Sequence, residues 1–139
     1  MQAALSFTGE ELFLSCDVKK SLFQTAGWII ILSDMEKREA FKMYLKEGCK
    51  EEYKKRHAAL WPEVRKILKD SGVYDYSIYL DEESGTLFAF QKISGSQSSQ
   101  DLGAEDAIKK WWHYMAPLMK TNEDESPVSV PLEEMFHLD

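Results

Sequence analysis

The sequence predicts an α+β domain whose elements follow the order β-α-β-β-α-β. Three observations support this class. Short runs alternate between apolar and polar residues and end at turn signals, which is typical of half-buried strands. Two segments instead repeat apolar residues at helical spacing. With 139 residues, 44% of them hydrophobic, the chain has room for one packed core.

The first half of the domain is predicted to be a strand followed by two helical segments. Residues 39–45 (EAFKMYL) alternate as a strand. The charged stretch 50–56 (KEEYKKR) is predicted to be a helix. Pro62 opens the next helical segment, because proline lacks the N–H that a first helical turn leaves unpaired. Gly72 is a natural end for that segment.

The middle of the chain predicts a β-hairpin. Residues 74–80 (YDYSIYL) and 86–93 (TLFAFQKI) are its strands, and the turn signal 81–85 (DEESG) joins them. Because side chains alternate along a strand, Tyr74 and Tyr76 are expected on the same face.

The second half of the domain predicts a loop, a helix and a closing strand. Residues 94–103 are polar and rich in Gly and Ser, and residues 104–119 form an amphipathic helical pattern. A proline-containing connection over 121–131 leads to a short strand over 132–138 (LEEMFHL). The whole order matches the ferredoxin-like split βαβ motif, a four-stranded antiparallel sheet with helices on one face.

The second sheet face is predicted to need a partner. Along the strand 86–93, Phe88 and Phe90 point away from Leu87 and Ala89, so both faces carry apolar groups. Helices cover only one face of a ferredoxin-like sheet, and an exposed apolar face is usually covered by another protein. We therefore expect a homodimer that packs sheet face to sheet face as a dimeric α+β barrel.

Residues 1–34 are predicted to be an N-terminal extension, and residues 35–139 the domain. The extension has no clear helix or strand period and lacks the basic start of a signal peptide. One hypothesis is that Met35 is the natural start of the protein. The intact mass of the native protein tests it.

Charge and cysteine content exclude several classes of function. The formal net charge of −7 disfavours nucleic acid, whose phosphates are also negative. No apolar run approaches the roughly 18 residues that span a bilayer, so no membrane segment is expected. Cys16 and Cys49 lack the spacing of a metal site, which favours free thiols in the reducing cytoplasm.

A tyrosine and a histidine are candidates for chemistry. Tyr53 and His57 stand at i and i+4, so they are neighbours on one helix face. Histidine is the side chain best suited to proton transfer near neutral pH. The plainer alternative is that His57 is a surface residue of a basic turn, and spacing leaves it open.

Aromatic residues are candidates for binding a sugar. Trp111 and Trp112 are about 100° apart around a helix axis, so one can face the core while the other faces a cleft. An indole packs its flat face on a sugar ring and donates its N–H to a hydroxyl. Tyr76 can reach the same cleft. The alternative, that both indoles and Tyr76 only fill the core, also stays open.

Three separated stretches resemble the L-rhamnose mutarotase family: EEYKKRHAALWPEVRKILKDSGVYDYSIYLD, KKWWHYM and ESPVSVPLEEMFHLD. The resemblance runs from about Lys37 to the C-terminus. It implies a dimeric ferredoxin-like fold and interconversion of the α and β anomers of L-rhamnose, with no metal or organic cofactor. It also implies a proton-transferring His57 and a sugar site of Tyr53, Tyr76, Trp111 and Trp112. Residues 1–34 and the segment SGSQSSQDLGAED depart from the family pattern.

Mutarotation opens a hemiacetal ring and closes it on the other face. It needs a base at the anomeric hydroxyl and an acid at the ring oxygen. We predict that His57 donates the proton to the ring oxygen. Two alternatives remain, because fold does not fix function. One is a small ferredoxin-like monooxygenase or haem-handling protein, and the other is a non-catalytic sugar-binding module.

Overall fold

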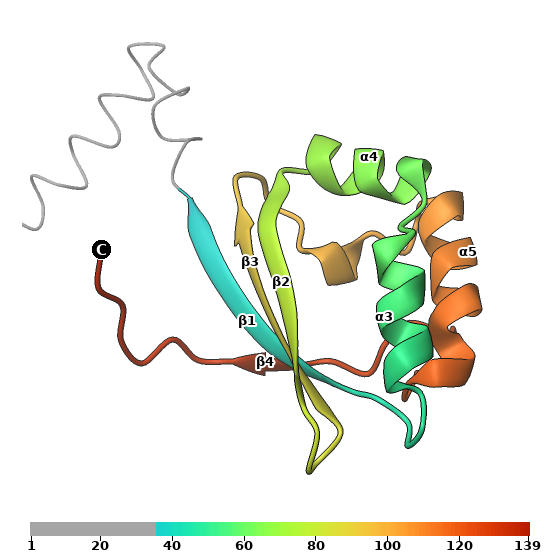
Figure 1. Cartoon of the computed structure of the whole chain (residues 1–139). Coiled ribbons are helices and arrows are strands. Elements are labelled where there is room, and N and C mark those ends of the chain that lie inside the picture. The colour runs from blue at the N-terminus through green and yellow to red at the C-terminus, as the bar shows by residue number, and fades with distance from the viewer. Residues whose placement is uncertain (1–35) are drawn as a thin grey trace, which may run out of the picture. The chain divides into compact units, whose positions relative to one another are not determined.

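A computed structural model describes residues 36–139, and the extension predicted over residues 1–34 lies outside the described residues. The sheet is antiparallel, with four strands in the order β2-β3-β1-β4 (Figure 1). The strands are β1 (Lys37–Tyr44), β2 (Val73–Asp81), β3 (Thr86–Ile93) and β4 (Val130–Leu132).

The helices lie together on one face of the sheet (Figure 1). They are α3 (Lys50–Ala58), α4 (Pro62–Asp70) and α5 (Asp106–Met115), with the short 3₁₀ turns η1 (Ser99–Asp101) and η2 (Ala116–Leu118). The predicted α+β class and the four-stranded antiparallel sheet are confirmed. Within residues 36–139, no helix is long and apolar enough to cross a bilayer.

Charge and proline placement explain the first two helices. Acidic residues occupy the first turn of α3 and basic residues its last turn, which complements the helix dipole. Pro62 is in the first turn of α4, as predicted. Gly72 follows α4 with φ of 88°, and a Cβ there would lie 2.6 Å from Ser94 Oγ. Only glycine allows the chain to reverse so closely between α4 and β2.

The core lies between the sheet and the helices. The inner face of the sheet contributes buried residues at alternate positions, such as Leu87 and Ala89 on β3. Helix α5 contributes Ile108, Trp111, Trp112 and Met115. The predicted continuation of this helix to residue 119 is wrong. Pro117 lacks an N–H and cannot extend an α-helix, so the chain tightens into η2.

A β-bulge makes the predicted face of Tyr74 wrong. The register between β2 and β3 shifts between Tyr74 and Ser77, and Asp75 adopts a positive φ of 47°. The extra residue reverses the alternation. Tyr74 therefore pairs with Lys92 on the outer face, whereas Tyr76 packs against the inner core.

The predicted strand over residues 132–138 is also wrong. β4 covers only Val130–Leu132 and pairs with the edge of β1, where Pro131 is tolerated. Residues 133–139, the C-terminal tail, then leave the sheet and run to the side opposite the helices (Figure 1). The alternating pattern of the tail lacks a core to pack on in the single chain, since Phe136 is 81% exposed.

Candidate active site

An aromatic cavity of about 560 Å³ lies between the sheet and the helices. β1, β2 and β3 form one wall, and α3, α4, α5 and η1 form the others. The structure brings all five residues predicted for the site to this cavity: Tyr53, His57, Tyr76, Trp111 and Trp112.

His57 lies against aromatic rings at the cavity wall. Its ring centroid is 4.3 Å from that of Tyr53 and 5.4 Å from that of Trp111, which meets it edge-on. Burial lowers the pKa of His57, and the hydrogen bond to the Tyr53 backbone acts in the opposite direction. The ring is therefore half-buried beside the cavity and not on a solvated basic turn.

One nitrogen of His57 has a fixed partner. Nδ1 lies 3.2 Å from the backbone carbonyl oxygen of Tyr53. A carbonyl oxygen only accepts, so Nδ1 must carry the hydrogen and donate it. In the neutral ring, which the lowered pKa favours, Nε2 then holds a lone pair. In this form, Nε2 can accept a proton.

The two tyrosines are neutral hydrogen-bonding groups. Burial is the main cause that raises the pKa of Tyr53 far above its ordinary range, and nearby Tyr76 adds to the shift. Burial also raises the pKa of Tyr76, while a hydrogen bond with the Ser99 side chain opposes the rise. Both phenols therefore keep their protons near neutral pH and can orient a hydroxyl group.

Both tryptophans are buried and both border the cavity. Trp111 is 7% exposed and Trp112 is 9% exposed, so they do not divide between core and cleft as the helical spacing allowed. Gly103 makes room for Trp112, because a Cβ at that position would lie 2.8 Å from the indole. Together they give the cavity a flat apolar wall suited to the C–H face of a sugar ring.

Trp61 supports the site and was missed by sequence reasoning. Its ring centroid lies 5.2 Å from that of Trp111, edge-on, and 5.3 Å from that of Tyr114, in a stacked arrangement. The Arg56 guanidinium covers the Tyr114 ring at 4.0 Å. These rings form a layer around Trp111, which in turn contacts His57. The available signal was an aromatic residue directly before Pro62.

Ser99 and Gln100 were also missed, because residues 94–103 were predicted to be a loop. The segment instead contains η1, with Ser98 and Asp101 forming a reciprocal capping box. Ser99 and Gln100 border the cavity from this turn. The spacing of Ser98 and Asp101 matches the capping-box pattern and was the signal that could have found the turn.

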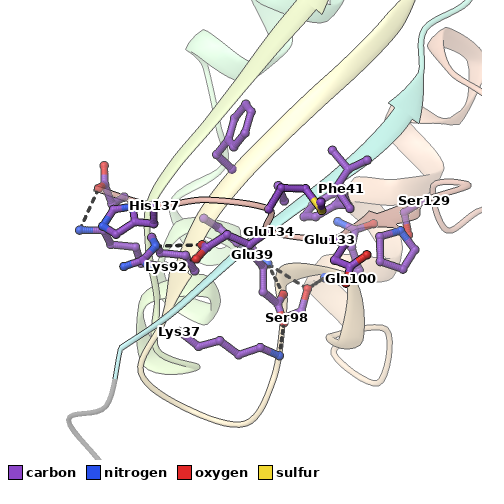
Figure 2. A pocket seen from close by; sticks show the side chains of 18 of the residues that line it. Lys37, Glu39, Phe41, Lys92, Ser98, Gln100, Ser129, Glu133, Glu134 and His137 are labelled. Atoms are coloured by element: carbon purple, nitrogen blue, oxygen red, sulfur yellow. Dashed lines mark hydrogen bonds and ion pairs between the residues drawn. The ribbon is translucent and has the colours of Figure 1, made fainter. Parts of the chain in front are cut away.

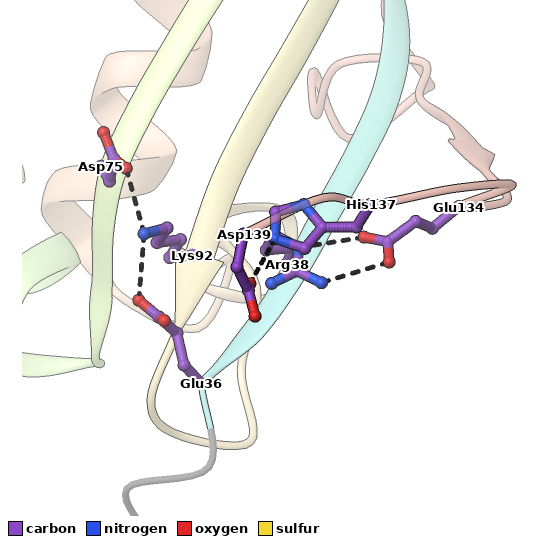
Figure 3. Close-up of polar contacts among 7 residues, drawn as sticks. All are labelled: Glu36, Arg38, Asp75, Lys92, Glu134, His137 and Asp139. Atoms are coloured by element: carbon purple, nitrogen blue, oxygen red, sulfur yellow. Dashed lines mark hydrogen bonds and ion pairs between the residues drawn. The ribbon is translucent and has the colours of Figure 1, made fainter.

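A larger groove of about 950 Å³ runs along β1 and the C-terminal tail (Figure 2). Charged pairs dominate its rim: Arg38 pairs with Glu134, and Lys92 with Glu36 and Asp75 (Figure 3). Its lining includes Phe41, which is 5% exposed, but none of the tryptophans and tyrosines that line the first cavity. Its tail wall is exposed, with Met135 at 85%. A small sugar therefore fits the inner cavity better.

The residues at the inner cavity suit proton transfer to a polyol. A half-buried imidazole with one free nitrogen faces aromatic walls and two phenols. Within residues 36–139, no group of three or more His, Cys, Asp or Glu side chains is arranged to hold a metal ion.

Comparison with known proteins gives one consistent family. The family model for L-rhamnose mutarotase matches residues 38–138. An L-rhamnose mutarotase of Phocaeicola vulgatus and one of Bacteroides thetaiotaomicron are each 60% identical over 103 residues, covering 74% of this chain and 99% of the relative.

A solved structure agrees. The crystal structure of L-rhamnose mutarotase from Formosa agariphila is 54% identical, with a TM-score of 0.69, and the match covers 74% of this chain and 99% of that one. The resemblance seen in the sequence is confirmed. The chain belongs to the L-rhamnose mutarotase family.

Proposed function

We propose that this chain interconverts the α and β anomers of L-rhamnose in the inner cavity. One observation carries the proposal: His57 has one nitrogen fixed by a backbone carbonyl and borders a cavity walled by two tryptophans and two tyrosines. Family membership supplies the substrate. Acid–base chemistry supplies the reaction, which has no redox step and forms no bond to the protein.

The reaction begins with His57 as a base. Nε2 accepts the proton of the anomeric hydroxyl, the bond between C1 and the ring oxygen breaks, and C1 becomes an aldehyde. The ring oxygen takes a proton from a second group or from water. This order revises the sequence prediction that His57 donates first, because Nδ1 already holds the ring hydrogen.

Ring closure is the same step reversed. The open aldehyde turns about its C1–C2 bond, and the C5 hydroxyl attacks the other face of the aldehyde. The C5 hydroxyl returns its proton to the second group or to water, and the imidazolium returns its proton to the new anomeric oxygen. Tyr53 and Tyr76 orient the sugar hydroxyls during both steps of the reaction. Trp111 and Trp112 hold the apolar face of the sugar with its methyl group. No atom is gained or lost overall.

Replacing His57 tests the proposal. His57→Gln keeps a polar side chain but removes a titratable base. We expect the exchange between the rhamnose anomers, measured by saturation-transfer NMR, to slow by about 10²–10⁴-fold, the usual contribution of a general base. His113→Gln is the matched control, because His113 is an exposed helical histidine paired with Glu125. An exchange rate unchanged in His57→Gln would remove His57 from the mechanism.

The anomer-exchange assay, together with measurements of sugar binding and oxygen uptake, separates the proposed function from the two alternatives. Rhamnose binding to the wild-type protein without faster anomer exchange would select a non-catalytic sugar-binding module. Oxygen uptake with a phenolic substrate, or a coloured purified protein, would select the monooxygenase or haem-handling alternative. Anomer exchange that depends on His57 excludes both.

We also propose that the domain is ferredoxin-like and forms a homodimer through the outer sheet face. The strand order β2-β3-β1-β4 supports the ferredoxin-like assignment. The outer face carries exposed apolar residues, including Tyr79 at 63% and Phe90 at 46%. A second copy of the chain is the simplest partner for this face, because a two-fold axis pairs the same apolar patch of both chains and buries both patches. Light scattering of the purified protein tests the mass.

The cysteines support a cytoplasmic location. Cys49 is a free thiol in the described part of the chain, and Cys16 lies outside it. Free thiols are typical of reducing compartments. Cell fractionation followed by thiol labelling would test this location.

A further inference from the structure

One polar wall of the inner cavity comes from η1. Ser99 and Gln100 border the cavity from this turn, and Ser99 is only 5% exposed. The two side chains are linked, because Gln100 Nε2 donates a hydrogen bond to Ser99 Oγ at 3.3 Å. Most other residues around the cavity are apolar. A sugar hydroxyl that faces η1 therefore meets a hydroxyl and an amide.

A buried glutamine of β3 holds η1 against the sheet. Gln91 is 2% exposed, and its Nε2 donates to Ser98 Oγ at 2.9 Å and to Glu39 Oε2 at 3.2 Å. Ser98 caps η1, and its Oγ also accepts a hydrogen bond from the Gln100 backbone N–H at 3.2 Å. Figure 2, a view of the larger groove, labels Glu39, Ser98 and Gln100, which also line that groove.

The orientation of the Gln91 amide follows from its neighbours. Burial acts to raise the pKa of Glu39, but hydrogen bonds from Lys37 and Gln91 outweigh it and leave the pKa lowered. The ionised carboxylate only accepts, so Gln91 must present Nε2 to it. Gln91 Oε1 is the only buried side-chain N or O without a hydrogen-bond partner within residues 36–139. The two donated hydrogen bonds are therefore what the amide contributes.

We propose that Ser99 and Gln100 form a second hydrogen-bonding wall that selects 6-deoxyaldoses by the positions of their ring hydroxyls, with Gln91 as the positioning residue that holds this wall. The proposal rests on the proposed function, because it takes the ligand of this cavity to be a sugar. A site that pairs with a hydroxyl rejects an analogue that places it elsewhere, because the buried polar groups are left unpaired.

Epimers of L-rhamnose provide the test. The C2 epimer 6-deoxy-L-glucose and the C4 epimer 6-deoxy-L-talose keep the methyl group and the ring but move one hydroxyl. For wild type and Gln100→Ala, we would measure anomer exchange by NMR and the dissociation constant of each sugar by calorimetry. We expect Gln100→Ala to lose about tenfold on L-rhamnose, the effect of one hydrogen bond, and much less on at least one epimer.

Gln97→Ala is the matched control for Gln100→Ala. Gln97 is exposed in the same segment and does not border the cavity. We expect it to leave the ratio between the sugars unchanged. Equal losses on all three sugars in Gln100→Ala, or no loss on any, would overturn the selecting wall.

The role of Gln91 is tested by a double-mutant cycle. Gln91→Met keeps the volume and removes both donated hydrogen bonds, and it also removes the unpaired acceptor. We expect it to lower the preference for L-rhamnose in the same direction as Gln100→Ala, with a melting temperature close to wild type. The double variant should lose little more preference than Gln100→Ala alone, because both act through one wall. Fully additive losses would overturn the positioning role.

Failure of this proposal is distinguishable from failure of the proposed function. If wild type accelerates no anomer exchange, the proposed function fails. The dissociation constants for the three sugars then still test the selecting wall. A binding preference for L-rhamnose that Gln100→Ala removes supports the wall. A preference that persists in Gln100→Ala, or no preference in wild type, overturns the wall.

Discussion

The two faces of the sheet use aromatic residues in opposite ways. Against the inner face, Trp111 and Trp112 of α5 are nearly buried and border a cavity with half-buried His57. On the outer face, Tyr79 and Phe90 remain exposed. Their rings meet edge-on, with the ring centroids 5.9 Å apart. Buried aromatic walls with few polar groups suit a small ligand. A broad exposed apolar face suits another protein surface.

The largest contrast is expected in stability. Trp111→Ala removes a buried indole that contacts His57, Trp61 and Tyr114, and should lower the free energy of unfolding by about 3–5 kcal/mol. Phe136→Ala, on the exposed tail, should stay within about 0.5 kcal/mol in dilute protein. Urea denaturation measures both. Equal losses would mean that the tail is packed as tightly as the core.

A charge on the outer face should break the proposed dimer. Phe90→Glu would bury an unpaired carboxylate between two sheets, and we expect the dimer dissociation constant to rise at least about a hundredfold. Ala104→Glu, an exposed position before α5, adds the same charge away from this face and is the control. Analytical ultracentrifugation gives the constants. A dimer that tolerates Phe90→Glu would place the interface elsewhere.

The pH profile sharpens the role of the inner site. The lowered pKa of His57 keeps the ring neutral at pH 7, so the rate should be flat there. The ordinary pKa of histidine is 6.5, and the pKa of His57 lies below it. Once the pH drops through this lowered pKa, the exchange rate should fall by about tenfold per pH unit, because the protonated ring cannot act as a base. Anomer exchange corrected for the buffer rate measures this. A rate that rises as His57 is protonated would restore its predicted role as the first donor.

The smallest effect is expected from the ion pair that ties the tail to β1. Arg38 contacts Glu134 at 3.1 Å, and their side chains are 38% and 49% exposed (Figure 3). Exposed pairs contribute about 0–1 kcal/mol. A double-mutant cycle with Arg38→Ala and Glu134→Ala, followed by thermal unfolding in low and high salt, measures the coupling. A larger coupling that resists salt would mean that the pair is buried in a dimer.

Much of the fold was predictable because its signals are local. Pro62 starts α4, and the turn after residue 81 leads into β3, which begins at Thr86 as predicted. Two of the three wrong predictions arose where local signals mislead. The bulge at Asp75 moves Tyr74 to the outer face. The strand predicted over residues 132–138 does not form, because the three-residue strand β4 ends at Leu132 and the tail leaves the sheet there. Alternation identifies a strand but does not reveal where its register slips.

The five candidate residues that line the inner cavity were predictable, but the hydrogen bonding of the histidine was not. Spacing made neighbours of Tyr53 and His57, and the resemblance added Tyr76 and the two tryptophans. Neither could supply the hydrogen bond between His57 Nδ1 and a backbone carbonyl, which is the basis of the proposal that Nε2 accepts a proton first. Spacing and resemblance also did not identify Ser99 and Gln100. Their segment is rich in Gly and Ser and is predicted to be a loop unless the capping box of Ser98 and Asp101 is recognised.

The sequence by itself determined the element types, the family and the side chains that can move a proton or hold a sugar. The element types follow from the periodicity of the residues along the chain, whereas the family and the full set of site candidates follow from the motifs that resemble the L-rhamnose mutarotase family. Only the tertiary structure decided that α3, β2, α5 and η1 converge on one cavity, and which nitrogen of His57 is free. The reason is physical: a pKa and a tautomer depend on burial and on partners brought in from elsewhere in the fold.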